Sequence, residues 1–559
     1  MAIAEQEEQA HVGAGMIPRG SETEQRQLLA FLPAVVIATV GAIAVIYATR
    51  LGPWAFSDGA GYVMLARNVV AGRGLGLMRA SGDFQPLSMH PPLYPLSLVA
   101  LRMIGVELMT AVRWLDAVLF ALTIVIAALT IYYVSRIAWL ALSAAAVTLV
   151  TPIMAELYTG ALSEPLFFVA GLGSLLLLVV FFDTRRRWML VVAGLAAGMA
   201  VLTRYLGVAY VGTGVVGLLI FGAREWKRRL VDTTIYTVLA ASPAGVWLAW
   251  TNAQSGAAAP RQWNWDLSGL WDRAEPIRGG LVAEFWNWIP FISGIEAVPY
   301  RYKLGLLAII GLALALALIF TVRRLWRLEG DAVRRDPALR LIGLMVLFIG
   351  GYLMMLSVVF LFGRPPLDAA DIDQRILTPV YLALLLSVFA MVLLVLRAWP
   401  GTRWGLGVPI VLTIVWFAPQ SWRTLERLRA ASGGYMSQSW LNSETVQSAR
   451  ALPGDVSIIS NESTALMFHL DRPAYDVPEL IRAEPQLIST RFGDGESGEE
   501  RIFREQGAAL ILFDSVFWQL KAIYDQDADS RLEAMTEGLE VYAELSDGAI
   551  YFYPDLTKP

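Results

Sequence analysis

Carboxylates and arginines are the residues of this chain that could carry out chemistry. The 559 residues include no cysteine and only three histidines, His11, His90 and His469. Disulfides, thiolate nucleophiles and thiolate zinc sites are therefore excluded, and isolated histidines make a poor transition-metal site. What remains is acid–base chemistry by carboxylates and anion binding by guanidinium groups.

The first acidic residue of interest lies in the stretch FSDGAGYVMLARNVVAGRGLG, residues 56–76, directly after the first long apolar run. Ser57 or Asp58 is predicted to be the N-cap of a helix that Gly72 ends. From Tyr62 onward, apolar residues repeat at i, i+3, i+4 and i+7, which is typical of an amphipathic helix on a membrane surface.

Two arginines stand out because they interrupt or border apolar runs. Arg204, in LTRYLG, separates two short runs, and an arginine within a membrane costs at least about 2.5 kcal/mol. It is therefore a candidate functional residue, with extension to the membrane interface as the structural alternative. Arg375, in DIDQRILTPV, borders a later run, and a salt bridge with Asp371 or Asp373 is its structural alternative.

The composition defines the elements that must position these residues. With 56% hydrophobic and 16% charged residues, the chain is expected to be an integral membrane protein. The net charge of −4 gives no electrostatic reason to expect a nucleic-acid partner.

A membrane helix needs about 20 apolar residues, and we count about eleven apolar runs that could serve. They lie near residues 31–48, 110–134, 137–157, 161–182, 188–202, 205–222, 231–251, 303–322, 341–362, 376–397 and 404–420. Residues 1–28 are polar and acidic without a cleavage site, and are predicted to be a disordered cytoplasmic tail. Residues 29–421 are predicted to form one polytopic α-helical domain with about eleven transmembrane helices.

Charge between the runs predicts the orientation, because short cytoplasmic loops collect arginine and lysine. The loops DTRRRW, AREWKRR, TVRRLWRLEGDAVRRDPALR and RAWPGTRW fall on alternate turns, on the side of the N-terminus. The opposite side receives two large loops, 51–109 and 252–302, and everything after about residue 421. We therefore expect the functional site on the extracytoplasmic side.

The last part of the chain, residues 422–559, differs in composition. Apolar runs shorten, and DVSIIS, AALILF and AIYFYP have the pattern of strands, with helical patterns such as SWLNSETVQSARAL between them. This segment is predicted to be a small extracytoplasmic α/β domain.

The first external loop continues as DFQPLSMHPPLYPLSLVALRMIGV, residues 83–106. Its four clustered prolines predict a rigid non-helical crossing followed by a second short helix. A long aromatic-bearing loop of this kind is uncommon unless it builds a site.

Several phrases together resemble the GT-C superfamily of polyprenyl-phosphate-sugar-dependent glycosyltransferases. They are SDGAGYVMLARNVVAGRGL, HPPLYPLSL, ALSEPLFF, LTRYLGVA and DQRILTPVYLALLL, in this order across residues 30–420. More narrowly, the chain resembles the branch that includes protein O-mannosyltransferases and the lipid A aminoarabinose transferase. The resemblance implies a GT-C fold, an inverting sugar transfer and, for bacterial members, a place in the cytoplasmic membrane.

In that family an acidic residue at the start of the first external loop acts as general base on the acceptor hydroxyl, and Asp58 occupies that position. Many protein mannosyltransferases have Asp followed by Glu here, whereas Gly59 follows Asp58. This difference disfavours a protein acceptor. The expected acceptor is a lipid-linked or cell-envelope glycan.

The resemblance also implies that cations hold the phosphate of the donor lipid. Arg204 and Arg375 are the main candidates, followed by Arg301 and Lys303, for which anchoring at the membrane interface is the alternative. Glu156 and Glu164, which flank Tyr158, could bind sugar hydroxyls or pair with Arg204.

The remaining substrate-binding candidates are Tyr62, His90, Tyr94, Tyr205 and Asp373. For His90, phosphate binding competes with a hydrogen bond that holds the loop. Tryptophans in the second external loop serve either as interface anchors or as stacking partners for sugar rings. They are Trp263, Trp265, Trp271, Trp286 and Trp288.

The expected reaction requires no cofactor, and a divalent cation held by carboxylates is left open. The expected partners are a polyprenyl-phosphate-linked sugar donor, the glycan acceptor and membrane lipids. Two other functions compete with this one. The first is protein O-glycosylation, and the second is non-catalytic glycolipid transport, although no internal repeat supports a transporter.

Overall fold

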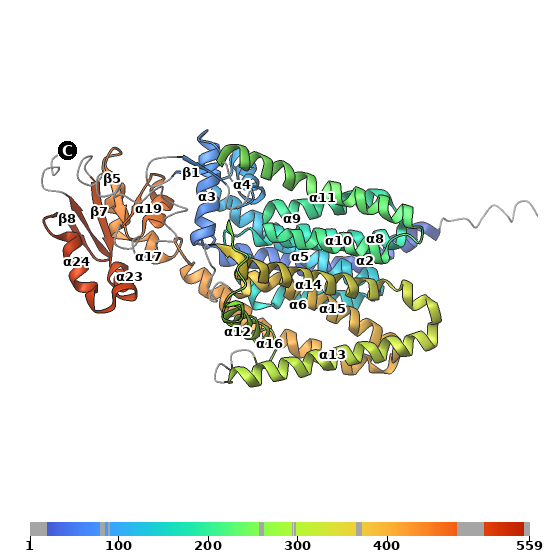
Figure 1. The fold of residues 1–559 in the computed structure, drawn as a ribbon. Helices are drawn as coiled ribbons and strands as arrows, with labels where there is room; N and C mark the ends of the chain where they lie inside the picture. The colour runs from blue at the N-terminus through green and yellow to red at the C-terminus, as the bar shows by residue number, and fades with distance from the viewer. Residues whose placement is uncertain are drawn as a thin grey trace, which may run out of the picture.

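The computed structural model shows a long helical bundle with a smaller α/β domain at one end (Figure 1). The structure describes residues 19–78, 84–87, 90–255, 262–292, 295, 298–364, 372–477 and 508–552.

The bundle is built from helices that coincide with the eleven predicted apolar runs. They are α2 (Arg19–Ala48), α5 (Leu108–Ser135), α6 (Ala138–Val150), α8 (Glu164–Thr184), α9 (Arg187–Thr203), α10 (Val208–Phe221), α11 (Trp226–Ser255), α13 (Tyr300–Glu329), α14 (Pro337–Phe362), α15 (Gln374–Ala398) and α16 (Arg403–Ala431). Six helical segments of the described chain are long and apolar enough to cross a membrane, and several shorter helices are also apolar. The predicted polytopic α-helical class is thereby confirmed.

Shorter elements connect the bundle helices. They are α3 (Ser57–Val70), β1 (Gly76–Met78), β2 (Phe84–Pro86), α4 (Leu93–Met103), α7 (Pro152–Leu157), η1 (Tyr205–Gly207), β3 (Gln262–Trp263), α12 (Leu270–Asn287), η2 (Gly330–Arg335), β4 (Gly363–Arg364) and η4 (Pro400–Thr402). The elements α3, α4 and α12 lie at the end of the bundle that faces the α/β domain (Figure 1). The α13–α14 connection, which carries a basic loop, lies at the opposite end.

Small residues let the bundle helices approach closely, as is common in membrane proteins. Gly171 of α8 faces Tyr210 of α10, and a Cβ at this position would lie 2.1 Å from the tyrosine ring. The rings of Tyr210 and Phe348 then stack at 4.2 Å between centroids. This packing holds α8, α10 and α14 together.

Helix α3 begins at Ser57, slightly earlier than a cap at Ser57 or Asp58 would place it. The N-cap position is Phe56, and no side chain caps the helix, so the prediction that Ser57 or Asp58 is the cap is wrong. The carboxylate of Asp58 is instead used in tertiary ion pairs. The predicted end is confirmed, because Gly72 adopts a φ of +74° directly after the helix.

The α/β domain contains one five-stranded sheet in the order β6-β5-β7-β9-β8. Its strands are β5 (Ser457–Ser460), β6 (Tyr475–Asp476), β7 (Ala508–Phe513), β8 (Glu540–Leu545) and β9 (Gly548–Phe552). Strand β5 pairs in parallel with β6 and β7, whereas β9 is antiparallel to β7 and β8. The helices are α17 (Gln438–Leu441), α18 (Glu444–Arg450), α19 (Ser463–Leu470), α23 (Ser515–Tyr524) and α24 (Ala528–Thr536), with the turn η6 (Asp525–Asp527).

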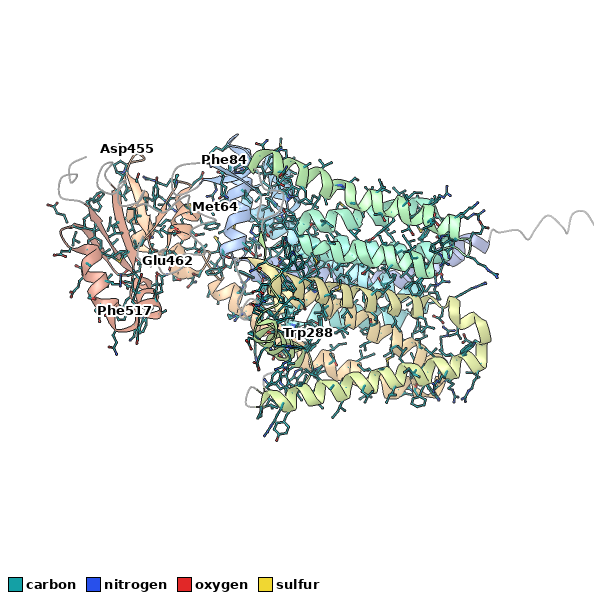
Figure 2. The ribbon with its side chains drawn as sticks, viewed as in Figure 1. Met64, Phe84, Trp288, Asp455, Glu462 and Phe517 are labelled. Carbon is teal, nitrogen blue, oxygen red and sulfur yellow. The ribbon has the colours of Figure 1, made fainter. Side chains whose placement is uncertain are left out.

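The α/β domain is joined to the bundle through α3. Helix α16 continues past the predicted boundary at residue 421 to Ala431, and α19 then packs against α3. Arg67 of α3 donates a hydrogen bond to the carbonyl of Phe468 at 3.0 Å, and Phe468 is buried in the same apolar core as Tyr62. Met64 of α3 accordingly lies at the junction of the two parts (Figure 2).

Candidate active site

Four charged side chains from separate parts of the chain form one ion-pair network at the end of the bundle that faces the α/β domain. Arg375 Nη2 lies 3.1 Å from Asp58 Oδ2, and Arg375 Nε lies 3.2 Å from Glu164 Oε1. Arg204 Nη1 lies 2.6 Å from the same Glu164 oxygen. The network therefore joins the starts of α3, α8 and α15 with the break between α9 and α10.

Local structure explains how Arg204 reaches this position. Helix α9 ends at Thr203, and Arg204 adopts an extended conformation with φ −149° and ψ 135° before the η1 turn. Its side chain can therefore leave the helix axis and contact the N-terminal end of α8. Glu164 begins that helix, where a negative charge is favoured by the helix dipole.

The Arg204–Glu164 pair is largely removed from solvent, since the Glu164 side chain is only 2% exposed. Two arginines share this one carboxylate, which compensates part of the cost of burying it. For Glu164 the alternatives were binding of sugar hydroxyls and pairing with Arg204, and the structure shows the pairing.

Asp58 is the accessible carboxylate of the network, with a side chain that is 27% exposed. Its second oxygen, Oδ1, lies 3.8 Å from His90 Nε2. Burial by itself raises the pKa of Asp58, but His90 in its protonated form, Arg375 and Arg204 together bring it below the usual value for aspartate. The carboxylate is therefore ionised at neutral pH.

A chain of polar side chains extends from His90 toward Glu164. His90 Nδ1 lies 3.5 Å from the Tyr62 hydroxyl, which lies 3.2 Å from Ser163 Oγ. Ser163 in turn donates a hydrogen bond to Glu164 Oε2 at 3.4 Å and accepts one from Arg204 at 3.3 Å. Ser163 was not predicted as a site residue, and its only signal in the sequence was its place directly before Glu164 in ALSEPLFF.

Asp373 belongs to the edge of the network. Its Oδ2 lies 3.9 Å from Arg375 Nε, and its Oδ1 accepts a hydrogen bond from the Ile376 amide, which caps α15. Burial raises the pKa of Asp373 above its usual value, in spite of this hydrogen bond and the neighbouring Arg375. The other predicted partner of Arg375, Asp371, lies outside the described residues.

Four of the predicted substrate-binding residues contact other parts of the protein. The Tyr158 hydroxyl is 2.6 Å from Thr123 Oγ1 in the bundle core, and Glu156 faces Arg427 at 3.8 Å. Tyr205 accepts a hydrogen bond from Trp247. Tyr94 is fully buried behind Tyr62, with ring centroids 5.2 Å apart.

Arg301 and Lys303 lie in the first turn of α13. The Arg301 guanidinium lies 4.9 Å from the centroid of the Tyr302 ring, and Lys303 Nζ lies 5.6 Å from that of Trp286. These aromatic contacts match the interface-anchor alternative for both residues. The structure does not bring them into an ion pair with the described residues of the network.

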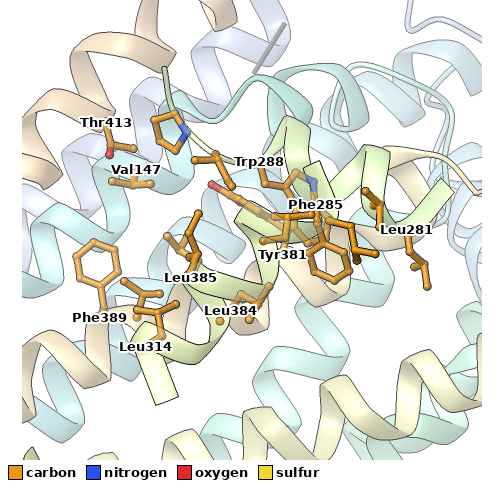
Figure 3. A pocket seen from close by; sticks show the side chains of 18 of the residues that line it. Val147, Leu281, Phe285, Trp288, Leu314, Tyr381, Leu384, Leu385, Phe389 and Thr413 are labelled. Carbon is orange, nitrogen blue, oxygen red and sulfur yellow. The ribbon is translucent and has the colours of Figure 1, made fainter. Parts of the chain in front are cut away.

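An apolar cavity of about 910 Å³ opens between α12, α13, α14, α15 and α16. Figure 3 shows Leu281 and Phe285 of α12, and Trp288 directly after this helix, among the side chains that line it together with Tyr381 and Leu384 of α15. The rings of Trp288 and Tyr381 are in contact, with centroids 5.5 Å apart. Tyr381 lies six residues along α15 from Arg375, or roughly 9 Å at 1.5 Å per residue. Helix α15 thus connects the cavity to the ion-pair network.

The described part of the chain contains no group of three or more histidines or carboxylates that could hold a metal ion. The tryptophans of the second loop divide between two environments. Trp288 lines the cavity, and Trp286 is buried, whereas Trp271 is 85% exposed.

The sequence matches no family model and no curated protein. The structure nevertheless has the fold of the GT-C glycosyltransferases, as the sequence resemblance implied. The chain is similar to ArnT from Cupriavidus metallidurans in the apo state, with 14% identity, a TM-score of 0.53, and coverage of 94% of this chain and 98% of ArnT. The structure of the same ArnT bound to undecaprenyl phosphate has 15% identity, a TM-score of 0.50 and coverage of 94% and 99%.

Proposed function

We propose that this protein is a membrane glycosyltransferase that moves a monosaccharide from a polyprenyl phosphate to a lipid-linked or cell-envelope glycan. The observation that carries the proposal is the meeting of Asp58 and Arg375 next to an apolar cavity. Asp58 can act as a base, Arg375 can bind an anion, and the apolar lining of the cavity suits a hydrocarbon chain such as that of an isoprenoid. The undecaprenyl phosphate bound to ArnT, a protein of the same fold, supports a donor of this class.

The reaction is a single displacement in which Asp58 accepts the proton of the acceptor hydroxyl. The acceptor oxygen bonds to the anomeric carbon of the sugar while the bond from that carbon to the phosphate oxygen breaks. The bonding electrons leave with the phosphate, whose added negative charge is stabilised by arginine. Arg375 is the more accessible of the two arginines, with 26% of its side chain exposed against 17% for Arg204. We therefore propose that Arg375 binds the donor phosphate, and that Arg204 holds Glu164 in place.

The backbone around Gly59 supports an acceptor other than protein. A Cβ at Gly59 would lie 2.8 Å from the Ala161 carbonyl oxygen, so packing disfavours the second acidic side chain that many protein mannosyltransferases have here. The site therefore offers one base rather than two adjacent carboxylates.

The proposed location is the cytoplasmic membrane of a bacterium, with the N-terminus in the cytoplasm. The basic loop between α13 and α14 lies at the bundle end opposite α3 and the α/β domain (Figure 1). With arginine-rich loops in the cytoplasm, the ion-pair network and the α/β domain face outward.

Transfer assays in proteoliposomes test the proposal. We would offer undecaprenyl phosphates carrying mannose, glucose, galactose or aminoarabinose, together with glycolipid or peptide acceptors. We expect transfer to a glycolipid with inversion at the anomeric carbon. Transfer to peptides alone would favour protein glycosylation, and movement of glycolipid across the bilayer without any transfer would favour a transporter.

A further inference from the structure

We propose that Asp58 and His90 act together as the base, and that His90 receives the acceptor proton from Asp58. This inference rests on the proposed function and assigns the site a second proton acceptor. It follows from how hydrogen-bond donors and acceptors are arranged around the two side chains.

The two oxygens of Asp58 have different surroundings. Oδ2 lies 3.1 Å from Arg375 Nη2, which donates a charge-assisted hydrogen bond to it. Oδ1 lies 3.8 Å from His90 Nε2 and accepts no charge-assisted hydrogen bond from Arg375, and both side chains remain partly exposed, at 27% for Asp58 and 30% for His90. Oδ1 is therefore the oxygen that can accept a proton from a bound hydroxyl.

The polar chain behind His90 has one consistent direction. Because Glu164 Oε2 is an acceptor, Ser163 donates to it, and the Ser163 oxygen is left to accept from Arg204 and Tyr62. The Tyr62 hydroxyl then donates to Ser163, and its oxygen accepts from His90 Nδ1–H at 3.5 Å. This order places the proton of a neutral His90 on Nδ1 and leaves the lone pair of Nε2 facing Asp58.

The lone pair of His90 Nε2 thus faces Asp58 Oδ1, and no proton lies between these two acceptors. A proton that Asp58 takes from the acceptor hydroxyl would be shared with His90 Nε2, where it forms an imidazolium beside a carboxylate. Asp58 alone holds a proton poorly, because its arginine partners favour the charged form. His90 is therefore the group that lets the base keep the proton while the sugar moves, and the proton then leaves to water.

The charged groups around His90 determine how readily its imidazole accepts a proton. Asp58 and Glu164 favour the imidazolium, whereas burial and the two arginines, Arg204 and Arg375, oppose it. Burial is the largest of these effects, and the pKa of His90 lies below its usual value. His90 is therefore neutral at pH 7 before the reaction, as a proton acceptor must be.

The first test reads the tautomer of His90 without any assay of transfer. The chain has three histidines, so ¹⁵N-histidine labelling of the full protein in nanodiscs gives three sets of ring signals, and His90→Gln identifies one of them. We expect His90 to be the Nδ1–H tautomer at pH 7, with a pKa that falls further in Asp58→Asn. An Nε2–H tautomer would overturn the proposal, because a proton would already lie between Nε2 and Asp58.

The second test measures transfer from whichever undecaprenyl-phosphate sugar the wild type uses. We expect His90→Gln to lower kcat by about 100-fold with the KM of the donor unchanged, in the range of general acid–base effects. We also expect imidazole to restore part of the turnover of His90→Ala. Unchanged kcat, or a rise confined to donor KM, would overturn the proton-acceptor role. If the wild type transferred no sugar, the proposed function would fail, and the tautomer measurement would still test the pairing.

Discussion

Arg375 and Asp58 lie 317 positions apart in the sequence, yet Arg375 Nη2 lies 3.1 Å from Asp58 Oδ2. One residue begins the last part of the bundle and the other begins the helix after the first apolar run. Their contact makes the base and the anion-binding group parts of a single site. A substitution at either residue should therefore affect the transfer reaction.

Arg375→Gln is expected to lower kcat/KM for sugar transfer by about 100-fold, because a donor of charge stabilisation for the leaving phosphate is lost. Arg375→Lys should recover only part of the activity, since an ammonium cannot contact Asp58 and Glu164 through two separate nitrogens. The matched control is Arg301→Gln, on the exposed first turn of α13, which should retain most of its activity. Equal losses in the Arg301 and Arg375 variants would argue against the assignment.

Glu164→Gln is expected to destabilise the fold, because it leaves Arg204 without its closest carboxylate in a nearly solvent-free position. Removing one partner of a buried ion pair typically costs about 3–5 kcal/mol. Thermal unfolding in detergent would measure this loss, with Glu156→Gln as control. Glu156 forms only a longer, half-exposed pair with Arg427, so its loss should cost less than about 1 kcal/mol.

The pKa values of Asp58 and His90 both lie below their usual values of 3.8 and 6.5. Each group then binds a proton less readily in the folded than in the unfolded protein, so the contribution of each to folding stability falls as pH is lowered. For His90 the loss begins below about pH 6.5, and for Asp58 it begins near pH 3.8 and continues below it. Unfolding curves between pH 3 and 8 should show the first loss disappear in His90→Gln and the second diminish in Asp58→Asn. A stability that rose on acidification through this range would contradict both assignments.

Phe468→Ala is expected to impair Asp58 indirectly, through the packing of α19 against α3. Phe468 is 4% exposed and packs in the apolar core that also contains Tyr62, so its truncation is expected to cost about 3–5 kcal/mol. The expected result is lower thermal stability together with reduced transfer, since α3 loses its support from α19. Trp518→Ala, in the exposed part of α23, is the control and should change neither quantity by much.

The bundle could be predicted from sequence because hydropathy alone defines a membrane helix. The break between two helices at Arg204 could also be predicted, because an arginine between two apolar runs is costly inside a membrane helix. Strand β8 was missed because it lies at the sheet edge and its residues are mostly exposed, which gives no apolar alternation.

The candidate site was only partly predictable. Charged residues at the ends of apolar runs pointed to Asp58, Glu164, Arg204 and Arg375, but the pairing among them depends on contacts between distant segments. The prediction that Asp58 caps α3 was wrong because its carboxylate forms a tertiary ion pair with Arg375 instead. Tyr158 looked like a site residue from its neighbours, although it packs against Phe120 in the core.

The role of Asp58 as base is tested by comparing donor binding and turnover in Asp58→Asn, reconstituted beside the wild type. Asparagine keeps the size of the side chain but cannot accept the acceptor proton. We expect binding of undecaprenyl phosphate to change by less than about threefold, while sugar transfer falls by at least about 100-fold. Transfer at the wild-type rate by Asp58→Asn would show that Asp58 is not the base.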